Sequence, residues 1–77
     1  QLLRELDLRS NRIVDVTLLQ SLTNLTKLHL GNNQIVDVTP LQSLTNLTEL
    51  GLWGNQISEN HPSVQVLRDR GVIVYCD

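Results

Sequence analysis

A 22-residue internal repeat restricts the folds open to this 77-residue chain more than any other feature. Residues 3–24 and residues 25–46 carry the same amino acid at 15 of 22 positions, and the pattern continues to residue 57. A repeat of this length is typical of solenoids, in which each unit buries its apolar face only against its neighbours. The recurring positions are Leu3, Leu6, Leu8, Asn11 and Ile13, then Leu25, Leu28, Leu30, Asn33 and Ile35, then Leu47, Leu50, Leu52, Asn55 and Ile57.

The spacing within each unit predicts one short strand and a tight return. Three leucines lie at positions i, i+3 and i+5, and only the last two have the alternation of a strand, so these two should point into a core. Apolar residues then recur at every third position, which suits a 3₁₀-like return with one face inward. In the second unit, Thr39 should cap this return and Pro40 should open it. The inward pairs are Leu6/Leu8, Leu28/Leu30 and Leu50/Leu52.

These motifs resemble a known family. The pattern L-x-x-L-x-L-x-x-N-x-I, with the phrase VDVTPLQSLTNL at residues 36–47, is similar to the leucine-rich repeat family and to its 22-residue class in bacterial internalins. The resemblance implies an α/β solenoid with a parallel β-sheet on its concave face and short 3₁₀ or irregular returns on its convex face. It also implies that the concave face binds a protein.

The residues after the third unit depart from the repeat and predict a cap. Residues 62–70 should form a short helix that begins after Asn60 or His61 and ends at Gly71. Residues 71–76 should form a fourth strand. Adding 22 to the third unit aligns Leu50, Leu52 and Asn55 with Val72, Val74 and Asp77.

We therefore predict a single leucine-rich repeat domain over residues 1–77, with repeats at about 3–24, 25–46 and 47–68 and a C-terminal cap at about 58–77. The first coil, meaning the first strand with its return, begins within the repeat and should expose an apolar edge. We expect the chain to be the C-terminal end of a longer array, or an excised or engineered piece of one.

Charge and composition exclude several classes of partner. The formal net charge is −2 and the pI about 5.5, which argues against nucleic acid or an anionic membrane as the main partner. The sequence contains no run of 18 apolar residues, so we expect no membrane insertion. Cys76 is the single cysteine and cannot form an internal disulfide. Nothing in the sequence indicates a compartment.

The asparagines Asn11, Asn33 and Asn55 should stack in register where each strand turns. An asparagine there can donate to and accept from the backbone of the adjacent loop, so we predict a structural role rather than a binding row. An ionised Asp77 cannot donate, and the row should end there.

Outward-facing strand residues supply the candidate binding site. The repeat predicts three rows across the sheet, namely Glu5-Lys27-Glu49-Gly71, Asp7-His29-Gly51-Ile73 and Arg9-Gly31-Trp53-Tyr75. The only aromatics, Trp53 and Tyr75, share the third row, and aromatic residues are enriched at interface hot spots. Gly31 and Gly51 should leave open surface beside them. The predicted protein-binding residues are Trp53, Tyr75, His29, Arg9, Lys27, Glu49 and Asp7. The alternatives are a solvated charged face and two rings that merely cover each other.

No pattern for catalysis, metal binding or a cofactor is present in the sequence. His29 beside Asp7 lacks a nucleophile, and His29, His61 and Cys76 lack metal-ligand spacing. Two glycosylation sequons, at residues 24–26 and 46–48, follow from the repeat itself. Outward apolar residues on the convex side form a small stripe of Val14, Leu18 and Val36.

We therefore predict a non-enzymatic module that binds a protein or peptide through its concave face. The alternative is a structural capping or self-assembly module that associates through its uncapped N-terminal edge, as a homodimer or on further repeats.

Overall fold

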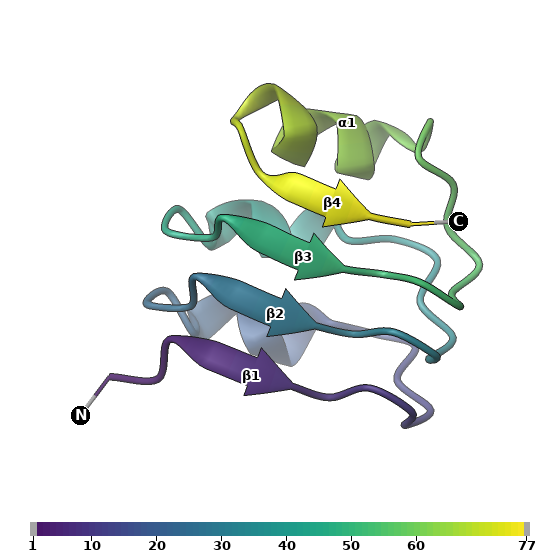
Figure 1. Ribbon diagram of the computed structural model, residues 1–77, viewed down its shortest axis with the longest axis horizontal. Helices are drawn as coiled ribbons and strands as arrows, with labels where there is room; N and C mark the ends of the chain where they lie inside the picture. The colour runs from purple at the N-terminus through teal and green to yellow at the C-terminus, as the bar shows by residue number, and fades with distance from the viewer. Residues whose placement is uncertain (1, 77) are drawn as a thin grey trace.

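The computed structural model describes residues 2–76 as a stack of coils, each with one strand in front and one return behind (Figure 1). The four strands form one parallel sheet in the order β1-β2-β3-β4. Two 3₁₀ turns and one α-helix lie behind the sheet (Figure 1). The elements are β1 (Glu5–Asp7), η1 (Thr17–Ser21), β2 (Lys27–His29), η2 (Thr39–Ser43), β3 (Glu49–Gly51), α1 (Pro62–Asp69) and β4 (Ile73–Tyr75).

The first three strands follow the predicted 22-residue register. Leu6 pairs with Leu28, and Leu28 pairs with Leu50, so one leucine column runs through the sheet. Leu28 and Leu50 are fully buried, whereas Leu6, in the first coil, is only partly buried. The predicted strands, inward leucines and 3₁₀ returns are therefore confirmed.

The start of each 3₁₀ turn differs from the prediction, because Thr39 is not the capping group. Val38 precedes η2 and makes no side-chain cap. Instead the Asp37 carboxylate accepts from the backbone N–H of Thr39 at 2.9 Å and from its hydroxyl at 2.6 Å. Asp15 accepts from Thr17 in the same way in the first coil. Hydrogen bonds from the threonine hydroxyl and backbone N–H lower the pKa of both carboxyls.

These carboxylates should make the fold less stable in acid. The folded-state pKa of each carboxyl lies below the ordinary value of 3.8. Each carboxylate therefore makes its full contribution to the stability of the fold above about pH 4, and this contribution disappears as the pH falls further. We expect the double variant Asp15→Asn/Asp37→Asn to lose less stability than wild type when the pH drops below about 4. Urea unfolding at a series of pH values measures this difference. Equal pH dependence for both proteins would contradict the assignment.

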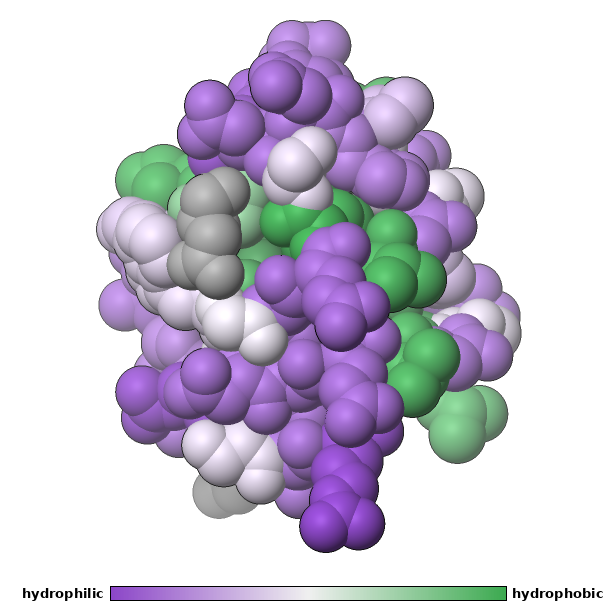
Figure 2. All heavy atoms as spheres, turned by 90° about the vertical axis from the view of Figure 1, so that its right-hand side faces the viewer, coloured by the Kyte–Doolittle hydropathy of each residue, from purple (hydrophilic) through white to green (hydrophobic). Residues whose placement is uncertain are grey.

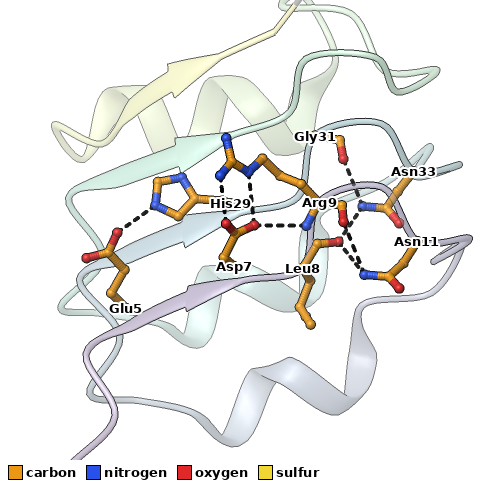
Figure 3. A network of polar contacts seen from close by, with 8 residues as sticks. All are labelled: Glu5, Asp7, Leu8, Arg9, Asn11, His29, Gly31 and Asn33. Atoms are coloured by element: carbon orange, nitrogen blue, oxygen red, sulfur yellow. Dashed lines mark hydrogen bonds and ion pairs between the residues drawn. The ribbon is translucent and has the colours of Figure 1, made fainter.

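The asparagine ladder is confirmed. The Asn33 side chain donates to the carbonyl oxygen of Leu8 at 3.0 Å (Figure 3). It also donates to the carbonyl oxygen of Leu30 at 2.9 Å and accepts from the N–H of Ile13 at 3.0 Å. Asn55 repeats this arrangement one coil further on. Each of these amides ties its own coil to the preceding one. Asp77, where the ladder should end, lies outside the described residues.

A left-handed backbone position recurs just before this ladder and was not predicted. Ser10, Asn32 and Gly54 occupy the same position of successive repeats and have φ of 61°, 57° and 78°. A Cβ at Gly54 would collide with the amide oxygen of Asn32, so a side chain there would require the Asn32 side chain to move, which glycine avoids.

The predicted cap helix is confirmed. The His61 ring accepts from the N–H of Ser63 at 3.1 Å, Pro62 opens α1, and Gly71, with φ of 92°, follows its end. Val64 and Leu67 of α1 are buried against the last coil. Among the described residues, no helix is long and apolar enough to cross a membrane.

The register of the fourth strand differs from the prediction. Leu50 pairs with Val74, 24 residues later, whereas the repeat predicted Val72. The two extra residues arise in the return between β3 and β4, because α1 has eight residues where η2 has five. An α-helix rises about 1.5 Å per residue and a 3₁₀-helix about 2.0 Å, so the helical path needs more residues to cross the same width.

Candidate protein-binding face

The concave face is built from the strand residues that alternate with the buried leucines. Every described strand has three residues, and its middle residue points inward. The outward residues form two rows across the sheet. They are Glu5, Lys27, Glu49 and Ile73 in one row and Asp7, His29, Gly51 and Tyr75 in the other.

Trp53 and Tyr75 do not share a row, contrary to the sequence prediction. The 24-residue step places Tyr75 opposite Gly51 and Ile73 opposite Glu49. The carbonyl oxygen of Trp53 accepts from the N–H of Asn32 at 2.7 Å, which sets Trp53 beside Gly31. Trp53 therefore continues the row of Arg9 and Gly31. The two aromatic residues therefore lie on adjacent coils but in different rows.

Two side-chain pairs organise the charges on the first two strands. The Arg9 guanidinium donates to both Asp7 oxygens, at 3.0 and 2.7 Å, and this contact lowers the pKa of Asp7 to about 2 (Figure 3). His29 lies 2.8 Å from the Glu5 carboxylate, so its ring pairs with Glu5 rather than with Asp7 (Figure 3). Within residues 2–76, Lys27 makes no ion pair.

The two concave glycines differ from each other. Gly31 is buried, and a Cβ there would lie 3.7 Å from the Arg9 side chain and 3.2 Å from the Trp53 carbonyl oxygen. The atom nearest to a Cβ at Gly51 would be the His29 Cα, at 3.9 Å. The prediction of open surface therefore fails at Gly31, which Arg9 covers, and Gly51 alone of the two leaves room.

Large apolar side chains stand out at the C-terminal end of this face. Trp53 is 55% exposed, Ile73 53% and Tyr75 44%. The repeat predicts that Ile73 faces outward, but Ile73 is not among the predicted binding residues. The corrected register, which sets it next to Glu49, identifies it as a neighbour of the predicted residues.

A separate apolar group lies on the convex side. Val14, Leu18 and Val36 are exposed as predicted, with Leu18 at 90%. Seen from the ends where the strands leave the sheet, the surface is mostly hydrophilic, with hydrophobic groups in its upper half and along its right margin (Figure 2).

Other chemical sites receive no support from the described residues. No group of three or more His, Cys, Asp or Glu side chains in residues 2–76 could hold a metal ion. A pocket of about 270 Å³ is lined by polar residues and includes none of the predicted binding residues. Its lining residues are Arg4, Asn24, Thr26 and Asn46. Cys76 is buried.

Comparisons with known proteins agree with this architecture. A family model described as "Leucine Rich repeats (2 copies)" matches residues 1–43 and 23–63. The crystal structure of internalin C2 from Listeria monocytogenes str. 4b F2365 is similar, with a TM-score of 0.72 and 39% sequence identity over 87% of this chain. The matched part is 29% of the internalin C2 chain, so the present chain spans less than a third of that protein. A comparison with curated proteins found no match.

Solenoids of this kind present extended concave surfaces that in general serve protein–protein interaction. The repeat, the parallel sheet and the two matches lead to one assignment. This chain belongs to the leucine-rich repeat family.

Proposed function

We propose that this chain is a non-enzymatic interaction module that binds a protein or peptide through the concave face of its sheet. The observation that carries the proposal is the group of three exposed apolar side chains, Trp53, Ile73 and Tyr75, on an otherwise polar face. Aromatic residues bury a large area with few rotatable bonds, and they are enriched where interface residues contribute most to binding.

The polar residues of this face suit the rim of such an interface. Asp7 and Arg9 belong to the first coil, Lys27 and His29 both lie on β2, and Glu49 lies on β3 beside Ile73. Exposed ion pairs contribute about 0–1 kcal/mol each, so these residues should tune specificity and association rate more than affinity.

Ligands selected from a random peptide library should reveal the preferred face. We expect Trp53→Ala to weaken binding of most selected ligands by about 2 kcal/mol or more, because it removes a large apolar contact. Lys27→Ala should mainly change the association rate and its dependence on salt. Surface plasmon resonance at two salt concentrations measures both effects.

Leu18→Ala on the convex side is the matched control, since Leu18 is also apolar and exposed but lies in η1. Selected ligands that lose affinity with Leu18→Ala, yet bind the folded double variant Trp53→Ala/Tyr75→Ala as well as wild type, would move the binding site to the convex stripe.

A second candidate function is capping or self-assembly through the N-terminal edge. Leu2 and Leu3 are 61% and 50% exposed, and within residues 2–76 β1 pairs on one side only. An unpaired apolar strand edge favours association with another strand. Light scattering over a wide concentration range tests this function, because a clean monomer at high concentration would contradict it.

A further inference from the structure

Gly51 forms a notch in the concave face. The nearest atoms to the Cβ position of Gly51 are the His29 Cα at 3.9 Å, the His29 Nδ1 at 4.0 Å and the Leu28 carbonyl oxygen at 4.0 Å. Asp7 and His29 hold this position of the repeat in the first two coils, so the third coil lacks a side chain where its neighbours have one.

Two ring-bearing residues flank the notch. Gly51 pairs with His29 of β2 on one side and with Tyr75 of β4 on the other. Neighbouring strands lie about 4.8 Å apart, so the Cα atoms of the two flanking residues are about 10 Å apart. A flat side chain from a partner would lie within this span, over Gly51.

The His29 ring presents a hydrogen-bond acceptor to this space. Its Nε2 lies 2.8 Å from the Glu5 carboxylate, which accepts only, so Nε2 carries the proton. In the neutral imidazole, Nδ1 then has a free lone pair, and Nδ1 is the atom 4.0 Å from the Gly51 Cβ position. A ligand that meets the neutral ring in the notch should therefore offer a donor on this side.

Glu49 adds a negative charge to the same site. It lies two residues before Gly51 on β3, so both positions face the concave side. Its register neighbour Lys27 makes no ion pair with it within residues 2–76, which leaves the carboxylate available to a ligand. The Asp7 carboxylate, by contrast, is held by Arg9.

We propose that the notch over Gly51 binds the guanidinium group of an arginine side chain from the partner. A guanidinium is flat, carries five donors in a fixed fork and stacks on aromatic rings. It can donate to the His29 Nδ1, pair with the Glu49 carboxylate and lie on the Tyr75 ring. This proposal rests on the proposed function, since the partner must approach the concave face.

The test is an NMR titration with the peptide acetyl-Gly-Arg-Gly-amide at pH 8. We expect saturable shifts of the Gly51 and His29 amide signals. The same peptide with citrulline in place of arginine keeps the shape without the charge, and should bind at least about fivefold more weakly.

Variants of the notch should weaken arginine binding. We expect Gly51→Val, which fills the space with a strand-compatible side chain, and Glu49→Gln each to raise the Kd at least about threefold. Asp69→Asn removes an equal charge from the exposed end of α1 and should leave the Kd unchanged. Circular dichroism shows that each variant is folded.

Two results would overturn the proposal, namely equal binding of the arginine and citrulline peptides, or arginine-induced shifts that persist unchanged in the folded Gly51→Val variant. The proposed function is tested separately, and it would be contradicted if the library ligands bound the Trp53→Ala variant as tightly as wild type. Ligands that depend on Trp53 but not on Gly51 or Glu49 would refute the arginine notch and leave concave recognition intact.

Discussion

Replacement of Leu28 by alanine is expected to lower the free energy of unfolding by about 2–5 kcal/mol. Leu28 is fully buried in β2, between Leu6 of β1 and Leu50 of β3, so coils on both sides enclose it. The substitution leaves a cavity in a packed core and removes the contacts that lined it. A small domain has a total stability of about 5–15 kcal/mol, so this loss is a large part of the whole.

Urea unfolding followed by circular dichroism measures the effect. Leu18→Ala is the control, because Leu18 is the same residue type in the same fold but is 90% exposed. It should change the free energy of unfolding by less than about 0.5 kcal/mol. A Leu28→Ala variant as stable as the Leu18→Ala variant would contradict the observed leucine column.

Asn33→Ala is expected to cost about 2–3 kcal/mol, through lost hydrogen bonds rather than lost apolar contact. The Asn33 side chain is largely buried, and it is the partner of the Ile13 N–H and of the Leu8 and Leu30 carbonyl oxygens. Alanine leaves these backbone groups without that partner at the junction of two coils, and a buried unsatisfied polar group is costly.

Asn11→Ala is the matched control for this experiment. Asn11 has the same repeat position, but it is exposed and its side chain donates only within its own coil, to Leu8 and Arg9. Its replacement should cost less than about 1 kcal/mol. Equal losses for Asn11→Ala and Asn33→Ala would mean that the ladder does not join the coils.

Much of the fold could be predicted because it depends on local periodicity. The spacing of Leu28 and Leu30 predicts a strand, and apolar residues at every third position predict the return. The end of the cap helix at Gly71 could be predicted, because the residue after α1 has a left-handed conformation that glycine adopts at little cost.

The register of the last strand could not be predicted from the repeat. It depends on the rise per residue of whichever helix forms the return, and α1 replaces a 3₁₀ turn there. One consequence concerns the candidate binding face, because the corrected register sets Tyr75 beside Gly51 rather than beside Trp53.

Residue spacing is enough to show which side chains face outward, since alternation along a strand assigns Lys27 and His29 to the face opposite Leu28. How the outward side chains pair with one another depends on the folded chain. Glu5 of β1 contacts His29 diagonally on the adjacent strand β2. The Arg9 side chain pairs with Asp7 and covers Gly31. The physical reason is that these contacts depend on cross-strand distances and on the reach of long side chains, neither of which is a property of residue spacing.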